Sequence, residues 1–111
     1  MADKLELLEG EVVELEVKGD YWENVISKLD KQKSGKFYFT NKRIVFATGI
    51  FNFTPMFEIY YSNIESVEKC NIGPLVKFLP TGIMVTAKDG NSYRFSVLKR
   101  EKYIEYIESK L

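Results

Sequence analysis

The chain has 111 residues, and its 16 basic and 16 acidic side chains give a formal net charge of zero. A general nucleic-acid-binding protein is usually basic overall, so we expect no nucleic-acid partner. Histidine is absent and Cys70 is the single cysteine, which excludes histidine-based catalysis, an internal disulfide and a cysteine-clustered zinc site.

The N-terminal part divides into an acidic leader, residues 1–10, and the start of a single predicted domain, residues 11–111. In residues 13–18, VELEVK, apolar and charged residues alternate, which predicts a half-buried strand. The leader has no long apolar run, and no stretch of the chain approaches the ~20 apolar residues of a membrane span. We therefore expect a cytoplasmic protein, which a membrane-binding function would place at the inner membrane face.

Residues 20–34 leave two interpretations open, a short helix or a loop. Asp20 and Glu23 have the spacing of a capping box. The following apolar residues recur at helical intervals: Trp22, Ile26 and Leu29. This local pattern favours a short helix that ends in an exposed loop before Gly35.

The rest of the chain predicts strands and then one helix. Residues 37–46 read as a hairpin around Asn41-Lys42, and residues 83–97 as a second hairpin around Asp89-Gly90. Two further strands are predicted at 57–61 and 64–70. From Lys99 the apolar period changes to about 3.6, and an amphipathic helix is expected with this apolar stripe: Tyr103, Ile104, Ile107 and Leu111.

The sequence of residues 35–46, GKFYFTNKRIVF, resembles a hairpin of GRAM domains and related bacterial PH-like domains. Residues 59–67, IYYSNIESV, and residues 82–95 resemble two further segments of that family. The similarity spans roughly residues 11–110. It implies a mainly β fold, a PH-like barrel of two roughly orthogonal antiparallel sheets with about seven strands, capped by a C-terminal helix.

Two candidate binding segments follow. The first is basic: Lys28, Lys31, Lys33 and Lys36. It would attract anionic lipid headgroups, at about 1 kcal/mol per basic residue, or it would be a solvated loop, which we favour. The second contains Phe51 and Phe53, which would enter a membrane interface, grip a peptide or pack inward.

Three further features carry alternatives. Leu75, Val76 and Phe78 would form a self-association surface or pack into the core. A turn and edge role is favoured for Lys42 and Arg43 over phosphate binding. Cys70 ends an alternating strand, and we expect a buried, inert thiol in preference to a reactive one.

The sequence contains neither a Walker-type phosphate loop nor G-x-S-x-G, and we predict no catalytic residue, metal or cofactor. The leading hypothesis is a non-catalytic binding module of the GRAM/PH-like type. It would recognise an anionic membrane lipid or a protein partner through loops at one end. The alternative is a self-associating scaffold protein, and hence a homo-oligomer.

Overall fold

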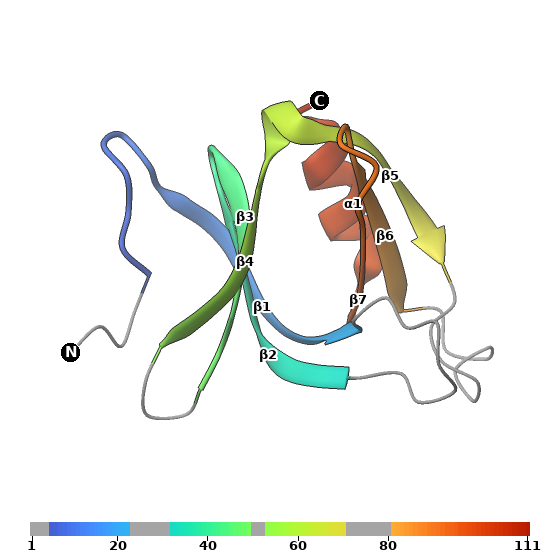
Figure 1. The fold of residues 1–111 in the computed structure, drawn as a ribbon, viewed down its shortest axis with the longest axis horizontal. Coiled ribbons are helices and arrows are strands. Elements are labelled where there is room, and N and C mark those ends of the chain that lie inside the picture. Colours follow the sequence, from blue (N-terminus) through green and yellow to red (C-terminus); the bar gives the residue numbers. More distant parts are fainter. Residues whose placement is uncertain (1–4, 23–31, 50–52, 71–80) are drawn as a thin grey trace.

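The computed structural model describes residues 5–22, 32–49, 53–70 and 81–111. The regular elements, in chain order, are β1 (Val13–Trp22), β2 (Gln32–Thr40), β3 (Arg43–Thr48), β4 (Thr54–Tyr60), the 3-10 turn η1 (Tyr61–Asn63), β5 (Ile64–Cys70), β6 (Gly82–Ala87), β7 (Ser92–Val97) and α1 (Arg100–Glu108). All seven strands are antiparallel and lie in one sheet in the order β4-β3-β2-β1-β7-β6-β5 (Figure 1). The predicted mainly β class, with a C-terminal helix, is confirmed.

The strands form one continuous sheet where two separate sheets were expected, because β1 belongs to both halves. Nine of its ten residues pair with β2 between Val13 and Trp22, with an irregularity at Glu14, and its last four residues also pair with β7. The edge strands β4 and β5 are not paired with each other in the part of the chain that the structure describes, so the sheet is not closed. Helix α1 lies beside β5 and β6 (Figure 1).

The expected helix is wrong where residues 20–34 are described. Asp20–Trp22 continue β1, and Gln32–Ser34 belong to β2, while residues 23–31 lie outside the described residues. The Tyr21 ring packs against Phe46 and Phe57, with centroid distances of 5.8 and 4.7 Å. Packing across the sheet therefore outweighs the local helical spacing in this segment.

The core lies on the inner face of the sheet. The Phe37 ring lies 4.6 Å from that of Phe46 and 4.5 Å from that of Phe95, and all three side chains are fully buried. Gly35 is required nearby, because a Cβ atom there would lie 2.3 Å from the Ala47 carbonyl oxygen. Phe37, Phe46 and Phe95 all lie in segments that the sequence predicts as strands.

Helix α1 covers one end of the core with the predicted apolar stripe. Tyr103 stacks on Phe39 at 5.2 Å, and Ile104 and Ile107 are buried. Leu111 lies beyond the last helical turn and is about half exposed. In the part of the chain that the structure describes, no helix is long and apolar enough to cross a membrane.

Candidate functional site

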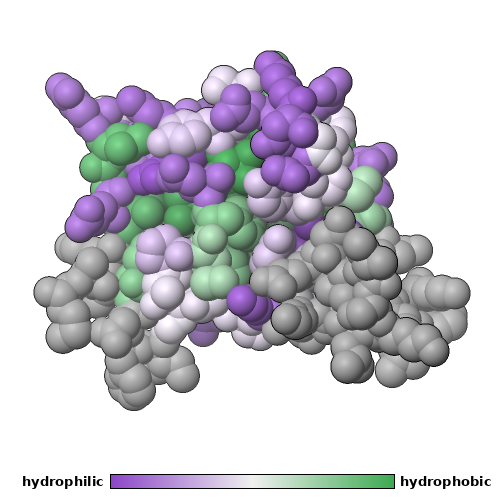
Figure 2. Space-filling view, viewed as in Figure 1, coloured by the Kyte–Doolittle hydropathy of each residue, from purple (hydrophilic) through white to green (hydrophobic). Residues whose placement is uncertain are grey.

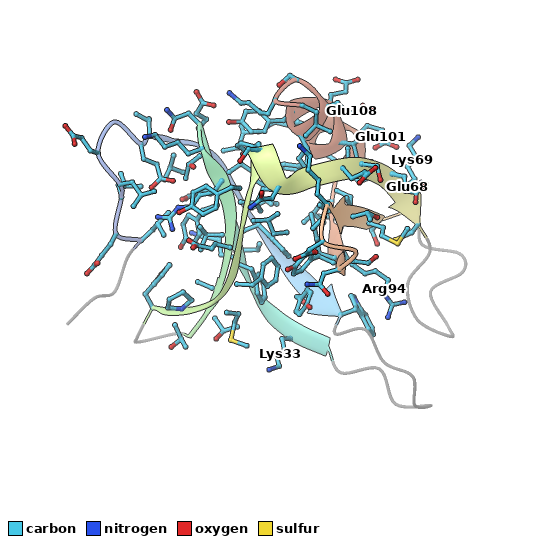
Figure 3. The ribbon with its side chains drawn as sticks, turned by 45° about the horizontal axis from the view of Figure 1, so that its top comes forward. Lys33, Glu68, Lys69, Arg94, Glu101 and Glu108 are labelled. Carbon is cyan, nitrogen blue, oxygen red and sulfur yellow. The ribbon has the colours of Figure 1, made fainter. Side chains whose placement is uncertain are left out.

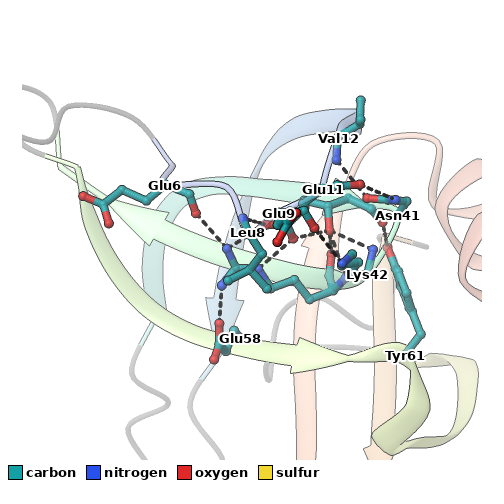
Figure 4. Close-up of polar contacts among 12 residues, drawn as sticks. Glu6, Leu8, Glu9, Glu11, Val12, Asn41, Lys42, Glu58 and Tyr61 are labelled. Atoms are coloured by element: carbon teal, nitrogen blue, oxygen red, sulfur yellow. Dashed lines mark hydrogen bonds and ion pairs between the residues drawn. The ribbon is translucent and has the colours of Figure 1, made fainter.

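The N-terminal segment, defined here as residues 5–12, is fixed to strand β3 by the Arg43 guanidinium (Figure 4). Arg43 Nε donates to Glu11 Oε2 at 2.8 Å, and Nη2 donates to Glu11 Oε1 at 3.0 Å. Nη2 also donates to the Glu6 carbonyl oxygen at 2.9 Å, and Nη1 donates to the Glu58 carboxylate on β4. One side chain thus ties the segment to both β3 and β4.

The turn between β2 and β3 holds the same segment with further hydrogen bonds. The Thr40 hydroxyl donates to Glu11 Oε2 at 2.7 Å. The Asn41 amide donates to the Gly10 carbonyl oxygen at 3.1 Å and accepts from the Val12 backbone N–H at 2.8 Å. These bonds add to the Arg43 contacts that hold the segment against β3.

The Glu11–Arg43 pair is buried, and its hydrogen bonds hold it ionised. Burial alone would raise the pKa of Glu11, but hydrogen bonds from Arg43, the Leu8 backbone N–H and Thr40 lower it to about 2. The hydrogen bonds with Glu11 raise the pKa of Arg43 above its usual value. A fully charged pair therefore anchors the segment across the physiological pH range.

The expected turn and edge role is wrong for Arg43. Its side chain is buried because β3 is an interior strand and the N-terminal segment covers it. Lys42 does lie in the turn, where its Nζ donates to the Glu9 carbonyl oxygen at 2.8 Å. Neither contact was visible in the local sequence, since both join residues more than thirty positions apart.

A groove of about 600 Å³ lies between the N-terminal segment and the outer face of β3 and β4. Its lining is mainly apolar, and the residues are Leu5, Glu6, Leu7, Leu8, Arg43, Val45, Phe53, Pro55, Met56, Phe57 and Glu58. Leu7, Leu8 and Met56 are 50%, 42% and 37% exposed. Figure 2 shows green, apolar atoms exposed on this left-hand side of the molecule, between purple polar side chains. Such a concentration of partly exposed apolar side chains is typical of a binding surface.

The structure brings together two of the predicted site residues. Phe53 lines the groove and packs against Tyr38 at a centroid distance of 5.7 Å. Lys36 Nζ lies 5.8 Å from the centre of the same Tyr38 ring, and 3.4 Å from Glu16 Oε1. Lys33 is half-buried near the start of β2, at the lower end of the view in Figure 3.

The other predicted site residues lie outside the described residues: Lys28, Lys31, Phe51, Leu75, Val76 and Phe78. The loop-end site and the self-association surface therefore remain predictions for these positions. The sequence interpretation missed the groove residues of the leader, Leu5, Leu7 and Leu8. Three leucines within four positions of an otherwise acidic leader were the signal available.

Three titratable groups outside the groove lining, Glu11, Glu14 and Cys70, have shifted pKa values. The pKa of Glu11 is low, and hydrogen bonds from Tyr106 and Lys110 lower the pKa of Glu14 as well. A general acid acting near neutral pH needs a raised carboxyl pKa. Burial raises the pKa of the Cys70 thiol, which makes it a poor nucleophile. Among the described residues, no three His, Cys, Asp or Glu side chains are grouped so that they would hold a metal ion.

Comparison with known proteins gives a fold neighbour but no family. No family model matches the chain, and no curated protein matches it. A solved structure, the C-terminal domain of an unknown protein from Leishmania infantum, is similar with a TM-score of 0.68. The similarity covers 92% of this chain and 85% of that chain at 19% sequence identity. At this identity the likeness shows a shared fold alone.

Proposed function

We propose that this protein is a non-catalytic binding module that takes an apolar segment of a protein partner into the groove beside the N-terminal segment. The observation that carries the proposal is the groove itself, which has a volume of about 600 Å³. Its lining is mainly apolar and includes the partly exposed Leu7, Leu8 and Met56. Pockets that bind ligands are commonly concave and apolar with a few polar groups. The polar groups here are Glu6, Glu58 and the Arg43 cluster beneath them.

We propose further that the sheet is a PH-like barrel, with β1–β4 and β5–β7 as its two halves. The strand order supports this interpretation, because β1 joins the halves and each half is a simple antiparallel meander. The position of α1 beside β5 and β6 also supports it, since the helix then fills the open side of the bent sheet (Figure 1). The GRAM-like hairpin of residues 35–46 covers the last six residues of β2, the turn and the first four residues of β3.

A protein partner is favoured over an anionic membrane by the local charge. The described lining of the groove contains two carboxylates, Glu6 and Glu58, and one cation, Arg43, which is already paired. Beside Phe53, Lys36 lies next to Glu16. An anionic lipid surface attracts basic clusters and is repelled by acidic ones. A membrane also presents a flat surface, whereas this site is concave.

The proposal is tested by selecting random displayed peptides on the folded protein and measuring their affinity by fluorescence anisotropy. We expect peptides rich in apolar residues, and we expect the double variant Leu7→Ser, Met56→Ser to weaken their binding at least tenfold. The matched control is Val12→Ser. Val12 belongs to the same segment and is 58% exposed, but it does not line the groove.

Flotation with vesicles of anionic or neutral lipid gives the second arm of the experiment. No enriched peptide, together with binding to anionic vesicles, would contradict the protein-binding proposal and support the membrane hypothesis. Equal loss of peptide binding in Val12→Ser and in the double variant would place the binding surface elsewhere. Light scattering of the free protein separates a self-associating scaffold from a monomeric module.

A further inference from the structure

We infer that the partner segment of the proposed groove carries a lysine or arginine beside its apolar residues. This inference rests on the proposed function, because it describes the occupant of the same groove. It follows from three features of the groove: the position of its two acidic lining residues, the excess of negative charge, and the way in which Arg43 fixes the walls.

The two acidic lining residues come from opposite walls. Glu6 belongs to the N-terminal segment, and Glu58 belongs to β4. Glu6 is exposed, and the Glu58 side chain is 47% exposed. The Arg43 guanidinium binds the carbonyl oxygen of Glu6 and the Oε2 atom of Glu58. One buried group therefore fixes the spacing of both walls, which reduces the entropy lost when a partner binds.

The described residues that line the groove and bind its Arg43 carry a net negative charge, although the whole chain is neutral. Among the described residues here, Glu6, Glu11 and Glu58 carry three carboxylates against the one guanidinium of Arg43, which leaves two negative charges in excess. Glu11 and Glu58 pair with the guanidinium, whereas Glu6 binds it through its carbonyl oxygen. The neighbouring Lys42 lies over the Glu9 carbonyl oxygen and is not among the lining residues. A cationic side chain on the partner would meet this excess charge while its apolar neighbours contact Leu7, Leu8 and Met56.

The same charge argues against two other occupants. In a symmetric dimer, a second copy would place Glu6 and Glu58 against the same acidic groove, which is unfavourable. An acidic peptide would meet the same repulsion. A partner segment with apolar residues and at least one Lys or Arg is the occupant that satisfies both the apolar lining and the excess negative charge.

The experiment uses the peptides selected on the full chain and compares their composition with that of the unselected library. We expect Lys and Arg to be enriched, and we expect replacement of the basic residue of the best peptide by norleucine to weaken binding about fivefold. Affinity should also fall as the salt concentration rises. The variant Glu6→Lys should weaken the basic peptide by a similar factor. Only the carbonyl oxygen of Glu6 binds Arg43, so this substitution leaves that bond in place.

Glu9→Lys is the matched control, because Glu9 is exposed on the same segment but does not line the groove. It makes the same change in net charge, and we expect it to alter affinity less than twofold. Apolar peptides without basic enrichment, or equal effects of Glu6→Lys and Glu9→Lys, would overturn this inference and leave the proposed function standing. A selection that yields no peptide would overturn both.

Discussion

The two faces of strand β3 are both buried, but by different means. On the inner face, Ile44 and Phe46 are covered by other strands of the sheet and are fully buried. On the outer face, Arg43 and Val45 lie under the N-terminal segment and the groove. On the inner face, apolar side chains pack against one another. On the outer face, ion pairs and hydrogen bonds to Arg43 attach the N-terminal segment that covers the strand.

This difference indicates how the two faces serve the protein. Apolar packing between strands is non-directional and is distributed over many side chains, so it stabilises the fold as a whole. The outer cover depends on a few directional bonds to one guanidinium, and it leaves leucines partly exposed. A stable inner face and a fixed but open outer face are consistent with the binding module proposed above.

The largest effect is expected on the inner face. Phe46→Ala should lower the free energy of unfolding by about 3–5 kcal/mol, because the ring is fully buried and contacts Phe37 and Phe57. Urea denaturation followed by circular dichroism measures this loss. Leu98→Ala is the control, since Leu98 is exposed and should change stability by less than about 0.5 kcal/mol. Similar losses for the two variants would contradict the assigned core.

Breaking the outer cluster should cost almost as much. Arg43→Met leaves the Glu11 carboxylate buried without its cation, and we expect a loss of about 3 kcal/mol in the free energy of unfolding. Adding Glu11→Leu to this variant removes the unpaired charge and should recover more than half of the loss. An additive result, in which the double variant is less stable than either single variant, would show that the pair is not coupled.

The sequence predicted the inner face well and the outer face poorly, for a physical reason. Ile44, Phe46 and Phe95 lie in segments that are predicted as strands from their residue types and turn signals, which are local, and all three side chains are buried where these strands pair. Burial of Arg43 depends on Glu11, which lies 32 positions away. No local pattern distinguishes this glutamate from the solvated acidic residues that surround it.

The extent of β1 and β2 was missed for the same kind of reason. Helical spacing in residues 20–33 suggested a helix, but Tyr21 packs on Phe46 and Phe57 across the sheet. Of the candidate site, Phe53 was identified from the sequence, whereas the leucines of the leader were not. The groove forms only when the N-terminal segment folds over β3 and β4. Neither of these two parts of the sequence predicts a groove by itself.

The pH dependence of stability distinguishes the outer cluster from the apolar core. Glu11 has a pKa of about 2 in the folded protein and about 4.3 in an unfolded chain. A carboxyl whose pKa is lowered on folding stabilises the protein above its unfolded pKa, and this contribution is lost as the pH falls toward 2. We expect about 2 kcal/mol to be lost between pH 5 and pH 2.

Urea denaturation at several pH values measures this slope, and Glu11→Gln is the informative variant. It should flatten the pH dependence between pH 5 and pH 2, because residue 11 then no longer titrates. Phe46→Ala is less stable at every pH but should keep the wild-type slope. A Glu11→Gln profile as steep as that of the wild type would assign the acid sensitivity to other carboxylates.

The smallest effect on stability is expected for the exposed ion pair between Lys36 and Glu16. Comparing it with the buried Arg43–Glu11 pair shows how much burial contributes to the stabilisation by an ion pair. These side chains are 37% and 52% exposed, whereas the Arg43 and Glu11 side chains are 9% and 0% exposed. A solvated pair is screened by water and salt, so Lys36→Gln should lower the free energy of unfolding by less than about 1 kcal/mol, and the loss should shrink further in high salt. The loss in Arg43→Met should depend much less on salt, since ions do not reach the buried pair.

Urea denaturation of both variants at low and high salt makes the comparison. Equal salt dependence for the two would show that the N-terminal segment leaves Arg43 accessible to solvent, and the groove would then lack the fixed wall on which partner binding depends.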